Sequence, residues 1–97
     1  MDAQSQSQLN EALLDGVPNG SIAEIRSLLD RNADIDARDQ HNDTPLHVAS
    51  RKGHHQCIEM LLDRHADIHA LGADDYTPLH LASWEGHHQC IELLLDR

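Results

Sequence analysis

The apolar residues of this chain return in short clusters separated by polar segments, as in a series of short amphipathic helices. Residues 55–64 carry them at the i, i+1, i+4, i+5 spacing that buries one face of a helix. These apolar residues are Cys57, Ile58, Leu61 and Leu62. A shorter helix precedes this one, because Thr44-Pro45 is typical of a helix start and Gly53 tolerates the left-handed conformation in which helices often end. The pattern therefore predicts a pair of helices between residues 44 and 64.

The same pattern recurs 33 residues later. Residues 44–64 align with residues 77–97 without a gap, and 17 of the 21 pairs are identical. A fainter copy precedes them in phase, with residues 33–35 matching residues 66–68. Because one such unit cannot bury its own apolar face, a period of this length predicts a stack of similar units.

The repeat divides the chain into four predicted segments. We expect a disordered N-terminal segment at residues 1–8, a degenerate capping repeat at 9–39, a full repeat at 40–72, and a repeat truncated at its C-terminal end at 73–97. The leucines at 93–95 then belong to a unit with one open side. This open side indicates a fragment of a longer array, or an end that pairs with something else, and it leaves the oligomeric state undecided.

The motifs of this repeat resemble those of ankyrin repeats. The resemblance rests on Thr-Pro-Leu-His-x-Ala, Gly-His, a Leu-Leu-rich helix and Ala-Asp-Ile at a period of 33, and it covers residues 8–97. It implies an all-α repeat solenoid of stacked helix-turn-helix units joined by β-hairpin-like loops. It also implies that a partner protein binds to a concave face formed by the hairpin tips and the first helices.

Matching residue by residue assigns structural roles to the motif positions. The resemblance implies that His47 and His80 hydrogen-bond the motif threonine and the adjacent backbone. The motif positions with a structural role are Thr44, Pro45, His47, Gly53, Thr77, Pro78, His80 and Gly86. Asn42 and Asp75 replace the hairpin glycine of the family, and both residue types tolerate the left-handed conformation.

The positions at which the two good copies differ indicate a candidate binding surface. Two of the four differences exchange one apolar residue for another, as core packing permits. The other two are adjacent and radical, from Arg51 to Trp84 and from Lys52 to Glu85, at the end of the first helix. The hairpin tips differ as well, so the scaffold is duplicated whereas the predicted binding face is not.

Both aromatic residues of the chain, Tyr76 and Trp84, fall on this face, and these residue types are enriched at binding hot spots. The candidate partner contacts are Gln40, His41, Asp43, Arg51, Lys52, Asp74, Tyr76, Trp84 and Glu85. An ordinary solvated face explains the charged and polar members nearly as well, and the two aromatic residues could instead cover the helix end and the hairpin. The surface is mixed in sign, with an acidic bias at the hairpins, and a partner with Arg or Lys near an apolar patch would complement it.

Composition narrows the classes of fold and partner. The chain has 97 residues and a formal net charge of −10, which argues against binding to nucleic-acid phosphates or to an anionic membrane surface. It has one Trp, one Tyr and no Phe, so the core must consist of aliphatic residues, and a β-sandwich is disfavoured. The first basic residue is Arg26, and no apolar run reaches the length of a membrane span. We therefore expect an intracellular protein, cytoplasmic or nuclear.

The histidines, the cysteines and the known catalytic motifs do not indicate a metal-binding or catalytic site in this sequence. Adjacent helical histidines point about 100° apart, and equivalent residues in neighbouring repeats lie about 8–10 Å apart, so we predict no metal site. The same spacing is too long for a disulfide between Cys57 and Cys90. No nucleophile elbow or phosphate-binding glycine loop is present, so we predict neither enzyme activity nor a cofactor. His55 and His88 replace Ile22 of the first copy, and their partial burial predicts sensitivity to acid.

Two classes of function remain. We favour a protein-interaction module that recruits a partner through the concave face and that forms part of a larger protein. The alternative is a structural spacer or scaffold array with no dedicated partner on this segment. Substitution of Trp84 and Tyr76 distinguishes the two, because only an interaction module needs these side chains for its function.

Overall fold

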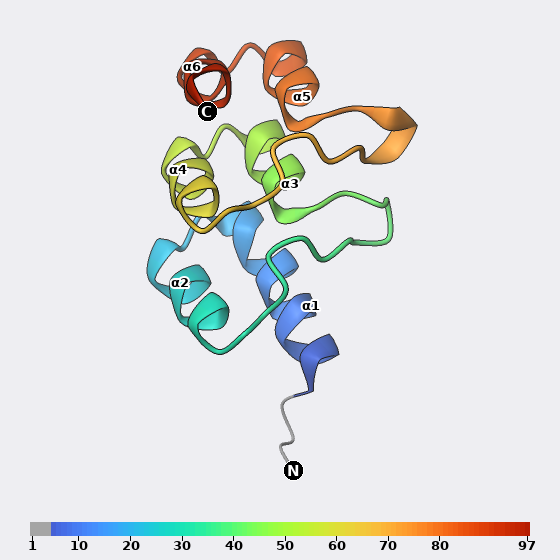
Figure 1. The fold of residues 1–97 in the computed structure, drawn as a ribbon, viewed down its shortest axis with the longest axis vertical. Coiled ribbons are helices and arrows are strands. Elements are labelled where there is room, and N and C mark those ends of the chain that lie inside the picture. The colour runs from blue at the N-terminus through green and yellow to red at the C-terminus, as the bar shows by residue number, and fades with distance from the viewer. Residues whose placement is uncertain (1–4) are drawn as a thin grey trace.

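The computed structural model describes residues 5–97, which form six α-helices and two short 3-10 helices. In chain order these are α1 (Gln6–Gly16), η1 (Val17–Asn19), α2 (Ile22–Asp30), α3 (Pro45–Lys52), α4 (His55–Asp63), η2 (Ala73–Asp75), α5 (Pro78–Glu85) and α6 (His88–Asp96). Figure 1 shows α1, α3 and α5 in one column and α2, α4 and α6 in the other, so each consecutive pair of α-helices forms one layer. The layers stack into an elongated body of 43 × 26 × 21 Å, which confirms the predicted helical repeat fold.

The second and third layers begin and end at the predicted residues. Thr44 and Thr77 cap α3 and α5, because each hydroxyl accepts a hydrogen bond from the backbone N–H three residues later. The proline after each threonine lies in the first helical turn, where its missing N–H leaves no bond unmade. Gly53 and Gly86 end these helices with φ angles of 76° and 72°, a left-handed conformation that favours glycine.

The first helix starts earlier than the polar N-terminal sequence suggested. We expected residues 1–8 to be disordered, but α1 begins at Gln6 with Ser5 as its N-cap. The Ser5 hydroxyl accepts a hydrogen bond from the Gln8 N–H, and the Gln8 side chain accepts one from the Ser5 N–H, both at 3.2 Å. This capping box stabilises a helix start within a polar segment, so the expectation was wrong for this part. Residues 1–4 lie outside the described residues, and the exact division into repeats stays a prediction.

A continuous apolar core runs between the two columns of helices. Its most deeply buried large members are Leu13, Ile25, Leu46, Ile58 and Leu61. The core is aliphatic, and neither Tyr76 nor Trp84 belongs to it, as the composition predicts. In the last helix Leu94 is buried whereas Leu95 is 66% exposed, so the apolar surface of the third layer is covered on one side more than on the other.

The loops that follow α2 and α4 carry the tips of the predicted binding face. Their β-hairpin character is not confirmed, because residues 5–97 contain no strand. Each tip is a tight turn closed by backbone hydrogen bonds, of which the one across its base before α3 runs from the Asp39 N–H to the Asp43 carbonyl at 2.9 Å. The equivalent bond before α5 measures 2.8 Å. Asn42 and Asp75 adopt left-handed φ angles of 69° and 61°, as their tolerance for this conformation predicts.

Histidines and arginines join neighbouring layers at regular intervals. The Nε2 atom of His54 lies 2.8 Å from the Pro18 carbonyl oxygen, and that of His87 lies 2.9 Å from the Arg51 carbonyl oxygen. The ion pairs between layers are Arg64–Asp30 at 2.8 Å and Arg97–Asp63 at 2.6 Å. Both sets of contacts repeat with the period of the sequence, so these side chains hold the stack together.

The two cysteines are part of the core. Cys57 and Cys90 are free thiols, and both are buried. Burial raises the pKa of each thiol, which favours the unreactive protonated form. They therefore pack as small apolar side chains, as predicted.

Candidate functional site

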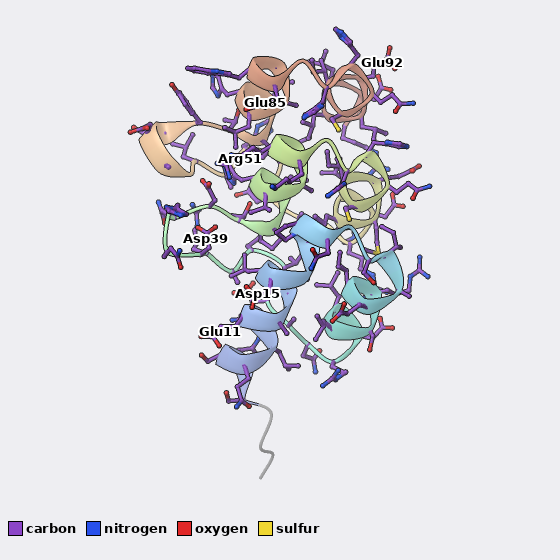
Figure 2. All side chains as sticks on the ribbon, turned by 180° about the vertical axis from the view of Figure 1, so that it is seen from behind. Glu11, Asp15, Asp39, Arg51, Glu85 and Glu92 are labelled. Atoms are coloured by element: carbon purple, nitrogen blue, oxygen red, sulfur yellow. The ribbon has the colours of Figure 1, made fainter. Side chains whose placement is uncertain are left out.

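The predicted binding residues lie on the side of the α3/α5 column that faces the loop tips. Figure 2 shows Arg51 and Glu85 on this side, whereas Glu92 of α6 lies on the opposite column. Asp39 marks the loop that precedes α3 on the same side (Figure 2). The contacts of the side chains in this region decide which of them are free to meet a partner.

The motif histidine of the second layer links that layer to the third. His47 Nδ1 accepts a hydrogen bond from the Thr44 N–H at 3.2 Å, so its Nε2 carries the proton and donates it to the Tyr76 carbonyl at 2.8 Å. Burial lowers the pKa of His47, although the bond to Tyr76 and the charge of Asp43 oppose this shift. The neutral imidazole is a fixed bridge between layers. In the third layer, His80 Nδ1 accepts a hydrogen bond from the Thr77 N–H at 2.9 Å and lies 2.8 Å from the Thr77 hydroxyl oxygen.

Asp43 belongs to this bridge and not to the exposed surface on which we placed it. Its side chain is 1% exposed, and its Oδ2 accepts a hydrogen bond from Arg51 Nη2 at 2.7 Å. Its Oδ1 accepts a second bond from the Ala73 N–H in the next loop at 3.1 Å. Burial opposes the charge of Asp43, but these bonds and the Arg51 charge outweigh burial and lower the pKa of Asp43. A bonded carboxylate beneath the surface cannot meet a partner, so Asp43 leaves the set of candidate contacts.

Aromatic residues take the place of this ion pair in the third layer. Tyr76 and Trp84 occupy the positions equivalent to Asp43 and Arg51, and their ring centroids lie 5.7 Å apart with the planes tilted by 48°. The Tyr76 ring also lies 5.6 Å from the imidazole of His80. Tilted ring contacts at these distances are favourable, so the half-buried ring of Tyr76 stabilises the position of the Trp84 indole. Trp84 is nevertheless 72% exposed, more than any other large apolar residue of residues 5–97.

Besides the buried Asp43, five of the predicted contacts line one depression, which we call the acidic recess. They are Arg51, Asp74, Tyr76, Trp84 and Glu85. The recess has a volume of about 210 Å³ and also reaches Asp43, Ala73 and Leu81. Gln40, His41 and Lys52 are exposed but do not line the recess. The structure thus brings together the third-layer candidates with Arg51, and it leaves the second-layer tip apart from them.

A second depression, which we call the apolar recess, is also lined by Tyr76 and Trp84. It is lined by Tyr76, Thr77, Leu79, His80, Ser83 and Trp84, and its volume is about 510 Å³. The sequence comparison missed Leu79 and Ser83, because they are identical to Leu46 and Ser50 of the second copy. Those two residues are buried, whereas Leu79 is half-buried and Ser83 is exposed. The place of α5 at the end of the column was the signal that could have found them.

The formal charge of the candidate surface changes from the second layer to the third. Residues 40–43 with 51 and 52 carry a formal charge of +1, whereas residues 73–76 with 84 and 85 carry −3. Among residues 5–97, no ion pair is found for Asp74 or Glu85. The acidic charge of this mixed surface, which we predicted at the hairpin tips, is therefore concentrated in the third layer.

Two features of residues 5–97 bear on metal binding and membrane insertion. Within that range, no three or more His, Cys, Asp or Glu side chains form a group that could hold a metal ion. The longest helix described there has 11 residues, and none is long and apolar enough to cross a bilayer.

Comparison with known proteins identifies the repeat. A family model described as "Ankyrin repeats (3 copies)" matches residues 11–97. The chain is 40% identical over 55 residues, or 55% of its length, to oxysterol-binding protein-related protein 1 of Rattus norvegicus, and equally to that of Mus musculus. It spans only 6% of the length of these curated relatives. The match to the family model covers nearly all of the described residues, and the chain belongs to the ankyrin repeat family.

Proposed function

We propose that this chain is a protein-interaction module that binds a partner protein through the face formed by its loop tips and first helices, as part of a larger intracellular protein. Ankyrin repeats are generally protein-interaction modules and are generally not enzymes. The short share of the curated relatives that the chain spans supports the larger-protein context. The proposed contacts are Gln40, His41, Arg51, Lys52, Asp74, Tyr76, Trp84 and Glu85.

The exposure of Trp84 is the observation that carries this proposal. An indole exposed to water buries little apolar surface and so adds little to the stability of the fold. Trp is, however, strongly enriched among the residues that contribute most to binding at protein interfaces. Trp84 also packs against Tyr76, whose ring lies in turn against His80, and this contact reduces the conformational freedom that the indole loses on binding. An oriented and exposed aromatic side chain is what an interaction site requires.

The spacer alternative is distinguished by the position of cross-links. A photoreactive amino acid at position 85 lies on the proposed face, and the same amino acid at position 92 lies on the α6 column and serves as the matched control (Figure 2). The proposal predicts that the chain, irradiated in cells, cross-links a defined protein from position 85 and not from position 92. Cross-links of equal yield and pattern from the two positions, or none from either, would support a spacer.

A further inference from the structure

We infer that the acidic recess receives one arginine side chain of the partner protein, whose guanidinium group stacks on the Trp84 indole and pairs with the carboxylates of Asp74 and Glu85. This inference rests on the proposed function, because it specifies the chemistry of the partner at the same face. Arg51 and Glu85 mark the place of the recess in Figure 2, on the side of the α3/α5 column that carries the loop tips.

The acidic recess lies between two layers and not at an end of the stack. Asp43 and Arg51 of the second layer form one part of its wall, and residues between 73 and 85 of the third layer form the rest. The Asp43 side chain also accepts a hydrogen bond from the Ala73 N–H at 3.1 Å, so the two parts of the wall are joined to each other. The recess therefore belongs to the junction of the second and third layers.

The repeat positions at the rim of the recess stay accessible when a further layer follows. In the second layer, which the third layer covers, His41 and Lys52 are exposed and the Arg51 side chain is 39% exposed. The third layer has at these positions Asp74, Glu85 and Trp84. The second layer thus presents neutral or basic side chains where the third layer presents acidic and aromatic ones, and this difference directs a cation to the third layer.

The charges of the recess favour a cation, although Arg51 lines it. The Arg51 Nη2 atom lies 2.7 Å from Asp43 Oδ2, so these two opposite charges compensate each other. Among residues 5–97, no ion pair is found for Asp74 or Glu85, and their carboxylates leave the recess with a formal charge of −2. A cationic side chain of a partner would neutralise half of this charge.

The shape and the remaining lining favour arginine over lysine. Trp84 is 72% exposed, and a planar guanidinium group stacks on an aromatic ring while its N–H groups bind carboxylates at its edge. Ala73 and Leu81 supply apolar surface for the aliphatic part of the side chain. The volume of about 210 Å³ lies below the usual range of about 300–1,000 Å³ for small-ligand sites, so the recess fits one side chain and not a whole ligand.

Blocked tripeptides test this chemistry without knowledge of the natural partner. The probe is N-acetyl-Gly-Arg-Gly-amide, and the controls replace its arginine by lysine or by citrulline, which has nearly the same shape and no charge. NMR shifts of the whole chain measure binding. We expect shifts at Ala73, Asp74, Trp84 and Glu85, and an affinity for the arginine probe about two- to fivefold above lysine and at least about fivefold above citrulline. An equal affinity for either control, or an absence of shifts at the recess, would overturn the inference.

Two neutral substitutions serve as a matched pair. Glu85→Gln and Glu92→Gln each remove one exposed carboxylate and change the net charge equally, on opposite columns (Figure 2). Glu85→Gln should weaken the arginine probe about two- to fivefold, whereas Glu92→Gln should leave its affinity unchanged. Equal effects of the two substitutions would show that the recess does not hold the arginine, and the inference would fail.

A third variant separates the indole from the carboxylates. Trp84→Leu should remove the preference for arginine over lysine and keep the preference for arginine over citrulline, because Asp74 and Glu85 remain. The side chain is exposed, so we expect the variant to fold, and its helicity and unfolding temperature are matched to the parent chain before titration. A full preference for arginine over lysine in this variant would overturn the stacking contact and with it the inference.

Two further outcomes separate this inference from its alternatives. Shifts at Arg51 and Glu85 that grow with protein concentration in the absence of peptide, together with dimers in sedimentation velocity, would assign the recess to a second copy of the chain and overturn the inference. A failure of the tripeptide selectivity while position 85 still cross-links a partner would overturn the stated chemistry and leave the interaction module intact. Loss of both results would overturn the proposed function as well.

Discussion

Tyr76 and Trp84 stand in the third layer where Asp43 and Arg51 stand in the second, so a contact between two rings replaces a partly buried ion pair at the same place in the repeat. The two pairs have different consequences for the surface. The Asp43 carboxylate is directed into the stack and binds the next loop. The aromatic pair leaves an indole exposed and forms the common wall of two recesses. The same pair of repeat positions therefore joins neighbouring layers in the second repeat and, as we propose, contacts a partner protein in the third.

Removal of the Asp43 carboxylate should loosen the second layer from the third. Asp43→Ala leaves Arg51 without its partner and the Ala73 N–H without its acceptor. We expect the free energy of unfolding to fall by about 2–3 kcal/mol, because hydrogen bonds to charged groups and their buried partners are involved. Urea unfolding measures this change. The control is Asp74→Asn, which removes an exposed carboxylate, keeps a side chain that tolerates the left-handed φ angle of 56° at this position, and should change stability by less than about 0.5 kcal/mol. Equal effects of the two substitutions would contradict the assigned bridge.

Gly72 is required by the space around it. Its φ angle is −104°, which other residues adopt, but a Cβ atom there would collide with Asp43 Oδ1 and lie 2.9 Å from His47 Nε2. Gly72→Ala should therefore displace both bridging side chains and cost about 1–3 kcal/mol of stability, as overpacking does.

Gly86→Ala provides the contrast to Gly72→Ala. No atom lies within 4 Å of a Cβ built at Gly86, and the cost there comes from its φ angle of 72°, at about 1–2 kcal/mol. The two variants differ in their NMR signature. Only Gly72→Ala should shift the side-chain resonances of His47, and unchanged His47 resonances in that variant would show that the close approach has no structural consequence.

Stability should fall as the pH drops below the usual His pKa of about 6.5, and His47 is the residue responsible. Its folded-state pKa is lowered, mainly by burial, so below that pH the unfolded chain binds a proton that the folded chain resists. The unfolded state then binds more protons, and the free energy of unfolding decreases with falling pH. The lowered pKa of Asp43 contributes only at much lower pH, below its usual value of 3.8. Thermal unfolding at pH 7.5 and pH 5.5 measures the effect.

A variant separates His47 from the other histidines. His47→Gln should unfold at a lower temperature than the parent chain at pH 7.5, but its difference between pH 7.5 and pH 5.5 should be smaller. His55→Gln and His88→Gln test the earlier expectation that acid sensitivity arises at those half-buried and exposed positions. If the pH dependence disappears in these variants and persists in His47→Gln, the role given to His47 is wrong.

The helices were predictable because their signals are local. Thr44-Pro45, Gly53 and the spacing of Cys57 and Ile58 all act within one or two turns, and the structure has helices at those places. The start of α1 was equally local, but the polar character of the segment outweighed the capping signal of Ser5 and Gln8 in our reading. The capping residues alone would have predicted the start of α1, whereas the polar composition of the segment led to the wrong prediction of disorder.

The candidate site was predictable only in part because its decisive contacts join different layers. The comparison of the two copies identified Trp84 and Glu85, since a change of residue is visible in the sequence. It could not reveal that Asp43 binds the Ala73 N–H 30 residues away, nor that an unchanged leucine becomes accessible at Leu79. Whether a neighbouring layer buries a side chain depends on the position of its repeat within the stack. This position cannot be read from repeats whose sequences are identical.

The central claim is that the Tyr76–Trp84 pair is the contact for a partner protein. The most direct test compares proteins captured by the chain with those captured by the Tyr76→Asp/Trp84→Arg variant, which installs the residues that form the ion pair of the second layer. Both chains are first matched for helicity and unfolding temperature. We predict that a defined protein is held by the parent chain and lost from the variant. Retention of the same proteins by both chains at equal yield would contradict the claim.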